Sequence, residues 1–165
     1  MLKRIGSMVA LLVSLATAAP AAQSPLFLVR HAERADAGRG GAGSDPELSA
    51  AGLARADALA VTLKDAGITA IFATEYKRTR QTAEPLAKAL GLTVTVVPAK
   101  DVAGLVERIG KSSGPVLVVG HSNTVPDVIK ALGVDTPVQI ADADYDNLFV
   151  VTMTPKPSLL RLHYR

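Results

Sequence analysis

The stretch LFLVRHAE at residues 26–33 decides the fold of the chain and the place of its chemistry. Its first four residues are all apolar, which is typical of a short strand buried on both faces of a sheet. Arg30 and His31 follow this strand at once. The stretch therefore predicts a buried strand whose carboxyl end carries a cation and an imidazole.

Downstream of this stretch, apolar strands alternate with amphipathic helices. Ser49 is a good N-cap, an apolar stripe continues to Leu63, and Gly67 is expected to end this helix in the left-handed conformation. Further strands are predicted at residues 68–73, 93–97, 116–119, 147–152 and 159–164, and further helices at residues 77–90, 101–109 and 124–132. This alternation indicates a single α/β domain of three layers, with a mostly parallel sheet flanked by helices on both faces.

The composition supports one packed domain. The chain has 165 residues, of which 48% are hydrophobic, and this apolar content excludes general disorder. Because the chain has no cysteine, disulfides, thiolate nucleophiles and zinc–thiolate sites are excluded together.

Residues 1–22 have the three parts of a secretory signal peptide, namely a basic start, an apolar run and small residues at its end. Cleavage is expected between Ala18 and Gln23. The apolar run is shorter than the roughly 20 residues that span a bilayer. An uncleaved anchor or a buried helix is the alternative. We therefore expect a domain at residues 23–165 that is periplasmic or secreted, without stable membrane insertion after signal cleavage.

The net charge does not indicate a nucleic-acid partner. Lys3 and Arg4 belong to the predicted signal peptide, and without them Lys plus Arg falls from 18 to 16 against 15 acidic residues. The remaining chain carries 16 − 15 = +1, down from +3. A charge so close to zero gives no reason to expect a polyanion-binding face.

Polar side chains follow several of the predicted strands. His31 and His121 each come directly after a buried strand, and Arg78 lies at the start of the helix after the second strand. Ligands of open α/β sheets bind at the carboxyl ends of the strands, so we expect these side chains and Arg30 to share one crevice. The third histidine, His163, lies in the terminal strand and is expected to be structural or exposed.

This set of side chains suits phosphoryl transfer. Guanidinium groups match the oxygens of a phosphate group and stay charged at any working pH. A neutral imidazole can take a phosphoryl group and pass it to water. A second imidazole can donate a hydrogen bond to oxygens that gain charge in the transfer. Nothing in the set requires a metal ion or an organic cofactor, and the expected partner is a small phosphorylated substrate.

Three blocks of the sequence resemble signatures of the histidine phosphatase superfamily, the group that includes cofactor-dependent phosphoglycerate mutase. Residues 28–33, LVRHAE, resemble its RHG signature. Residues 74–83, TEYKRTRQTA, resemble its second block, with Thr74 in the place of the usual serine, and residues 119–122, VGHS, resemble its third. The start of the helix around Gly52 is also similar. The blocks follow the order of the family and together are highly specific.

The resemblance implies a phosphoglycerate mutase-like fold and assigns a role to each matching residue. His31 would be the nucleophile that forms a phosphohistidine. Arg30 and Arg78 would clamp the phosphate, and His121 would complete the pocket. Arg80 has no counterpart and is expected to lie at the surface or to face the substrate.

The sequence also departs from the family pattern. Ala32 stands in the place of the usual glycine, as it does in small members that act on phosphohistidine proteins. Ser122 follows the second histidine where other branches have aspartate, which argues against the phytase and acid phosphatase branch. Asp142, Asp144 and Asp146 are expected to form a loop, because the glycine and the distal glutamate of a calcium site are missing.

The glutamate that protonates the leaving group in mutases has no clear match. Asp101, Glu75 and Glu33 therefore stay open as general acids. Without such an acid the enzyme would favour leaving groups that depart easily.

The expected function is an exported, metal-independent phosphatase that hydrolyses a phosphomonoester or phosphoramidate. The alternatives are a non-catalytic phosphate-binding module and a protein phosphohistidine phosphatase. The last of these suits the small size of the chain and Ala32, but the predicted signal peptide argues against it.

Overall fold

The computed structural model describes residues 24–36, 39 and 44–165. The predicted signal peptide at residues 1–22 lies outside the described residues, and so does most of the glycine-rich stretch at residues 37–43. The described residues form β1 (Leu26–Arg30), α1 (Ala50–Leu63), β2 (Ala70–Ala73), α2 (Lys77–Leu90), β3 (Val94–Val96), α3 (Val102–Gly110), β4 (Val116–Gly120), α4 (Thr124–Ala131), β5 (Asn147–Thr152) and β6 (Ser158–His163).

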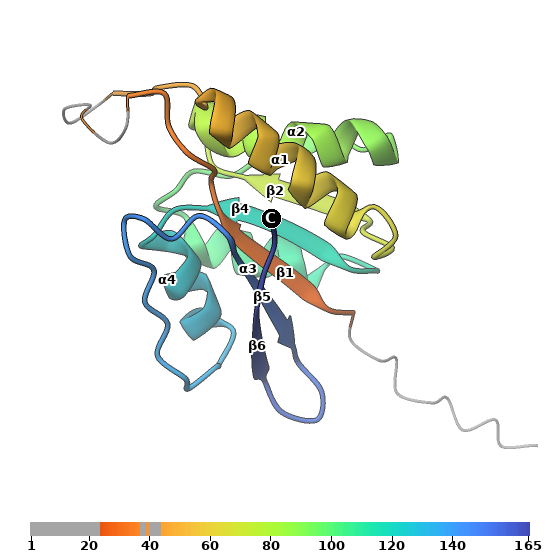
Figure 1. Cartoon of the computed structure of the whole chain (residues 1–165). Helices are drawn as coiled ribbons and strands as arrows, with labels where there is room; N and C mark the ends of the chain where they lie inside the picture. The colour runs from red at the N-terminus through yellow and green to blue at the C-terminus, as the bar shows by residue number, and fades with distance from the viewer. Residues whose placement is uncertain (1–23, 37–38, 40–43) are drawn as a thin grey trace, which may run out of the picture.

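The strands form one six-stranded sheet in the order β3-β2-β4-β1-β5-β6. The pairs β1–β4, β2–β4 and β2–β3 are parallel, whereas β5 is antiparallel to β1 and β6 is antiparallel to β5. Helices α1 and α2 cover one face of the sheet, and α3 and α4 cover the other (Figure 1). The predicted α/β class, with a mostly parallel sheet between two helical layers, is confirmed.

The two helical layers bury two separate hydrophobic clusters against the sheet, because successive side chains of a strand point to opposite faces. In β4, Val118 packs with the α3 and α4 residues Leu105 and Val125. Its neighbour Val119 packs with the α1 residue Leu59 and the α2 residue Leu86. Since both faces of β4 are buried, its sequence is a continuous apolar run instead of an alternating one.

Most predicted element boundaries agree with the structure to within two residues. Asp101 caps α3, and Gly91 ends α2 with a φ of 66°. The prediction that Gly67 ends the first helix is wrong. The helix stops at Leu63, and Gly67, whose φ is 68°, lies in the turn that follows. The N–H of Ala66 bonds the Leu63 carbonyl, a tighter turn than that of an α-helix, and this turn ends the helix early.

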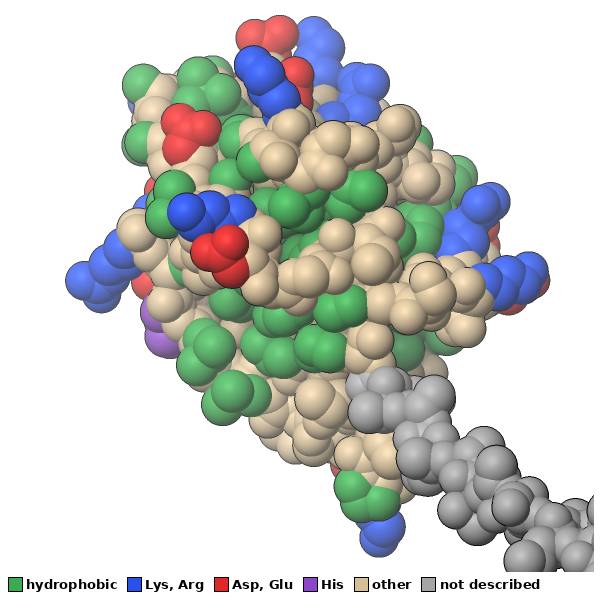
Figure 2. Space-filling view, turned by 90° about the vertical axis from the view of Figure 1, so that its right-hand side faces the viewer, with side chains coloured by type: hydrophobic (Ala, Val, Ile, Leu, Met, Phe, Trp, Pro, Cys, Tyr) green, Lys and Arg blue, Asp and Glu red, His purple; other side chains and the backbone are tan. Residues whose placement is uncertain are grey.

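The two ends of the parallel strands differ in character. The face shown in Figure 2 lies at their amino ends, where uncharged groups occupy the centre and charged side chains lie mainly at the margin. The polar residues predicted to carry the chemistry all lie at the opposite end, after β1, β2 and β4. Within the described ranges, no helix combines the length and the apolar character that crossing a membrane requires.

Candidate active site

The two histidines that follow buried strands meet at the carboxyl ends of β1 and β4. The strands are parallel neighbours with Arg30 opposite Gly120, and the His31 N–H donates to the Gly120 carbonyl over 2.9 Å. This backbone bond extends the ladder one step past the strands, so the rings of His31 and His121 lie edge to face with centroids 5.3 Å apart. The predicted convergence of the two imidazoles is therefore present.

The backbone fixes the tautomer of His31. Its Nδ1 lies 2.7 Å from the Ala32 carbonyl oxygen, which can only accept a hydrogen bond, so Nδ1 carries the proton and Nε2 has a free lone pair. Burial is the main cause that lowers the pKa of His31 to about 3; the Ala32 hydrogen bond opposes it, and the nearby His121, Arg78 and Arg30 add to it. The ring is therefore neutral and nucleophilic at ordinary pH.

The guanidinium of Arg30 binds the loop after α4 through Nη1 and leaves Nε and Nη2 for the site. Its Nη1 donates to the carbonyl oxygens of Ala141 at 2.8 Å and Asp142 at 3.0 Å, and its guanidinium stacks on Tyr145 with 4.2 Å between the guanidinium carbon and the ring centroid. Its Nε is buried without a partner among the described residues, and Nη2 has one contact, at 3.5 Å to the Tyr145 hydroxyl. The Nε–Nη2 edge thus keeps the paired geometry that binds an oxyanion.

Arg78 is equally prepared for an anion. It stacks on Tyr76 at 4.3 Å, its Nη2 lies 3.4 Å from Nδ1 of His121, and its Nη1 lies 3.7 Å from a carboxylate oxygen of Asp45. Its Nε and Nη1 are buried and have no hydrogen-bond partner in the part of the chain that the structure describes. Burial lowers the pKa of Arg78, which nevertheless stays charged. Unsatisfied buried donors of this kind can bind an anion such as a phosphate group.

Two hydrogen bonds position His121, one to its backbone and one to its ring. Its backbone N–H donates to Oγ1 of Thr124 over 2.8 Å, and its Nε2 lies 2.8 Å from Oγ1 of Thr74. The preceding Gly120 permits this packing, because a Cβ at that position would lie 2.6 Å from Oγ1 of Thr124. Burial, followed by the charge of Arg78, lowers the pKa of His121 to about 4, so this ring is neutral as well.

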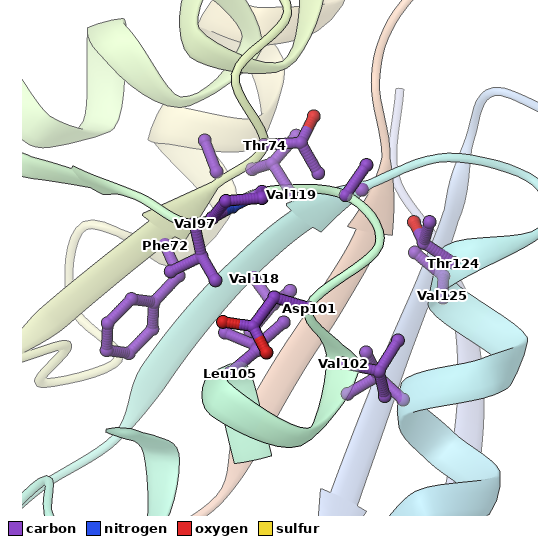
Figure 3. A pocket seen from close by; sticks show the side chains of 15 residues that line it. Phe72, Thr74, Val97, Asp101, Val102, Leu105, Val118, Val119, Thr124 and Val125 are labelled. Carbon is purple, nitrogen blue, oxygen red and sulfur yellow. The ribbon is translucent and has the colours of Figure 1, made fainter. Parts of the chain in front are cut away.

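A cleft of about 350 Å³ opens beside these groups and is lined by Tyr76, Arg78, Lys100, His121 and Asn123 among others. A second void lies deeper, between α3, α4 and the sheet (Figure 3), but its volume is about 20 Å³ and its walls are almost entirely apolar. A void of that size holds about one water molecule and no substrate. The cleft of about 350 Å³ is the candidate substrate site because Arg78 and His121 line it, whereas His31 and Arg30 are not among its lining residues.

The comparisons with known proteins agree with this geometry. The family model of the histidine phosphatase superfamily (branch 1) matches residues 26–101, a range that includes Arg30, His31 and Arg78 and ends before His121. Over residues 26–101 the chain is therefore similar to this superfamily. No curated protein matches the chain.

Solved structures of phosphatases share the fold of this chain. Mycobacterial glucosyl-3-phosphoglycerate phosphatase in complex with VO3 is 17% identical, with a TM-score of 0.70 over 86% of this chain and 100% of that one. The protein histidine phosphatase SixA in complex with tungstate is 21% identical, with a TM-score of 0.68 over 84% and 96% of the two chains. Phosphoserine phosphatase from Entamoeba histolytica in complex with 3-phosphoglyceric acid is 14% identical, with a TM-score of 0.66 over 86% and 96%.

Other residues of the superfamily blocks support the site without facing the cleft. Thr82 accepts a hydrogen bond from the Ala32 N–H over 3.0 Å and donates to the Arg78 carbonyl over 2.7 Å, so one hydroxyl links the loop after the nucleophile to α2. Gln81 accepts from the Leu48 N–H over 2.8 Å and holds the segment before α1. These roles depend on tertiary contacts, and reasoning from the sequence did not find them.

Two small residues near the nucleophile, Ala32 and Gly52, have a structural explanation. Ala32, in the place of the usual glycine, is fully buried and packs in a small cluster with Leu48 and Ala56. Gly52 is needed for the start of α1, because a Cβ there would overlap the Glu33 carbonyl oxygen. A side chain is thus tolerated at residue 32 and excluded at residue 52.

The three open candidates for a general acid all have structural partners. Glu33 accepts from Arg55, with a shortest distance of 2.6 Å. Burial raises the pKa of this carboxyl, but the hydrogen bond and charge of Arg55, a backbone hydrogen bond and the charge of Arg30 together lower it below its usual value. Asp101 accepts from the Gly104 N–H at the start of α3 over 2.9 Å. Glu75 accepts from the Ala99 N–H over 2.7 Å, although its charge also reaches His121.

The other polar residues that the sequence singled out are not among the residues that line the cleft. Arg80 is exposed, in agreement with a surface position. His163 is half exposed in β6, where its Nδ1 lies 3.1 Å from Asp146. Asp144 lies in the predicted loop, where its carboxylate accepts from the Ala141 N–H over 3.0 Å. Among the described residues, no three His, Cys, Asp or Glu side chains are grouped so that they could hold a metal ion.

Proposed function

We propose that the chain is a metal-independent phosphatase that works through a phosphohistidine on His31. The observation that carries this proposal is the Nδ1 contact of His31 with the Ala32 carbonyl, which leaves Nε2 unprotonated beside two arginines with unsatisfied donors. In the first step, a bond forms between Nε2 and phosphorus while the bond from phosphorus to the leaving group breaks. The leaving group departs with its electron pair and takes up a proton.

In the second step, water attacks the phosphohistidine. The new P–O bond replaces the N–P bond, Nε2 regains its lone pair, and orthophosphate leaves with the proton that the water loses. Arg30 and Arg78 stabilise the charge on the equatorial oxygens in both steps, as fixed donors do in other phosphoryl transfers. Two charged guanidinium groups can supply this stabilisation without a divalent cation.

The proposed substrate is a small phosphomonoester or phosphoramidate with a good leaving group, encountered outside the cytoplasm. The leaving-group preference follows from the carboxylates, since Glu33, Asp101 and Glu75 each accept a structural hydrogen bond. The location follows from the signal-peptide pattern of residues 1–22. The cleft of about 350 Å³ suits a small substrate.

The test uses residues 23–165 and p-nitrophenyl phosphate with EDTA present, beside the variants His31→Ala and His163→Ala. We expect turnover in EDTA, loss of turnover in His31→Ala, and full turnover in His163→Ala, whose ring lies on β6 away from the cleft. A base-stable, acid-labile phosphoenzyme should accumulate after a rapid quench.

Each other outcome has a clear meaning. A folded wild type that binds phosphate without turnover would identify a phosphate-binding module. Turnover confined to phosphohistidine peptides would identify a protein phosphohistidine phosphatase. Activity that persists in His31→Ala would refute the assignment of the nucleophile, and activity abolished by EDTA would refute metal independence.

A further inference from the structure

A chain of buried hydroxyl groups leads away from His121 into the protein, and its direction follows from the acceptors at its end. Oγ1 of Thr79 lies 3.0 Å from the Thr74 carbonyl oxygen and 2.8 Å from the Tyr76 carbonyl oxygen. Both oxygens can only accept, so the single hydroxyl proton of Thr79 is directed to them. Toward its other neighbour, the Thr79 hydroxyl must therefore act as an acceptor.

That neighbour is the hydroxyl of Thr74, whose Oγ1 lies 3.0 Å from Oγ1 of Thr79. Thr74 consequently donates its own proton to Thr79 and is left as an acceptor for Nε2 of His121, at 2.8 Å. The two backbone carbonyls thus fix the direction of every hydrogen bond in this chain of hydroxyl groups. At its end, Nε2 of His121 must be the donor and therefore carries a proton.

The contact at Nδ1, on the opposite side of the His121 ring, independently requires a proton on Nε2. Nη2 of Arg78 lies 3.4 Å from Nδ1 of His121, and a guanidinium can only donate. Nδ1 is therefore an acceptor, and the single proton of the neutral ring must be on Nε2. Thr74, Thr79 and His121 are all buried, with exposures of 7%, 0% and 8%, so solvent does not compete for these bonds.

We propose that Thr74 and Thr79 are positioning residues that keep the proton of His121 on Nε2, so that every proton His121 gains or loses passes through Nδ1 on the side of the phosphate site. The consequence for catalysis rests on the proposed function. His121 can donate a hydrogen bond to phosphate oxygens only after Nδ1 has taken up a proton. The sequence-based expectation that this ring simply donates therefore requires the charged ring, with Thr74 still accepting at Nε2.

The first test is NMR of the ¹⁵N-histidine-labelled chain, which has three imidazoles to assign, with His163→Ala as the assignment control. Two-bond ¹H–¹⁵N spectra distinguish a proton on Nδ1 from one on Nε2. Without ligand, we expect the proton on Nε2 in His121 and on Nδ1 in His31. With inorganic phosphate bound, the Nε2–H of His121 should persist. A proton found on Nδ1 of His121 in the free protein would overturn the proposal.

The second test compares Thr74→Val, which removes the hydroxyl at similar volume, with Thr74→Ser, which keeps it. We expect Thr74→Val to lose the single tautomer of His121, to keep the tautomer of His31, and to lower kcat about tenfold with little change in KM, the effect of one buried hydrogen bond. Thr74→Ser should restore both readouts, and Thr79→Val should show a weaker form of the same change.

The two proposals fail in different ways. If the wild type has no phosphatase activity, the spectra still decide whether Thr74 fixes the tautomer. If Thr74→Val keeps the Nε2–H tautomer and wild-type kcat, the positioning role is refuted while the phosphatase assignment stands. Should Thr74→Val fail to fold, the wild-type spectra and Thr79→Val decide.

Discussion

The rings of His31 and His121 lie 5.3 Å apart and hold their protons on different nitrogens. His31 donates from Nδ1 to the Ala32 carbonyl, whereas His121 donates from Nε2 to Thr74. The unprotonated nitrogen is therefore Nε2 in His31 and Nδ1 in His121. Both imidazoles are thus neutral beside two arginines, and an anion bound there would accept a hydrogen bond from His121 only after Nδ1 of that ring has taken up a proton.

The first prediction concerns the two neighbouring arginines of α2. Arg78 points into the site with a side-chain exposure of 11%, whereas Arg80 is exposed. We expect Arg78→Ala to lower kcat/KM for p-nitrophenyl phosphate by roughly 10- to 100-fold, because hydrogen bonds to charged groups contribute about 1.5–3 kcal/mol. Arg80→Ala, the matched control, should stay within about twofold. Equal losses in both variants would mean that only general surface charge matters.

The second prediction concerns the leaving group. A general acid contributes about 10²- to 10⁴-fold when the leaving group is poor. If none of the three carboxylates acts as the acid, the ratio of kcat for p-nitrophenyl phosphate to kcat for phenyl phosphate should be large in the wild type. The ratio should change by less than about threefold in Glu33→Gln, Glu75→Gln and Asp101→Asn. A variant that loses activity on phenyl phosphate alone would identify the acid that we consider absent.

The third prediction concerns stability and pH. The pKa of His31 is about 3 in the folded chain, against 6.5 for an ordinary imidazole. The unfolded chain therefore binds more protons between these two values, and the free energy of unfolding rises with pH across that window. The contribution is complete above about pH 6.5 and is lost as the pH falls below it, with a slope of at most about 1.4 kcal/mol per pH unit for one ring.

Urea denaturation at pH 5 and pH 7 measures this effect. His31→Gln, which cannot be protonated, should lose less stability between pH 7 and pH 5 than the wild type does. His121→Gln should behave in the same way, because the pKa of His121 is also lowered, to about 4. Parallel pH profiles for wild type and variants would contradict the buried, neutral state of these rings.

The fourth prediction compares two helical glycines. A Cβ at Gly52 would overlap the Glu33 carbonyl oxygen, whereas a Cβ at Gly110 would have no atom within 4 Å. We expect Gly52→Ala to destabilise the fold by about 1–3 kcal/mol, the range for overpacking, and to lower activity by displacing the loop after His31. Gly110→Ala should be neutral or stabilising by up to about 1 kcal/mol. Equal free energies of unfolding for the two variants would contradict the close approach.

The sequence was sufficient to predict the parts of this protein that depend on local pattern. Apolar runs such as residues 116–119 predicted buried strands, and the rule that ligands bind at the carboxyl ends of strands brought His31, His121 and Arg78 together. The family resemblance added roles that spacing alone could not assign. The signal-peptide prediction for residues 1–22 is not tested by the described residues.

The supporting contacts could not be predicted, since they join segments far apart in the chain. The bond from Ala32 to Thr82 and the approach of Gly52 to Glu33 depend on how α1 and α2 pack. The pairing of Glu33 with Arg55 has the same origin. The position of Gly67 was mistaken for a helix end because a left-handed glycine marks a turn equally well.

Arg30 holds the segment after α4 through backbone oxygens of Ala141 and Asp142 and through the ring and hydroxyl of Tyr145. Every residue type has a carbonyl group, so mutations at Ala141 and Asp142 can replace side chains without removing these two hydrogen bonds, whereas the contacts with Tyr145 depend on its side chain. Positions 141 and 142 are in this respect free to change while Arg30 stays in place.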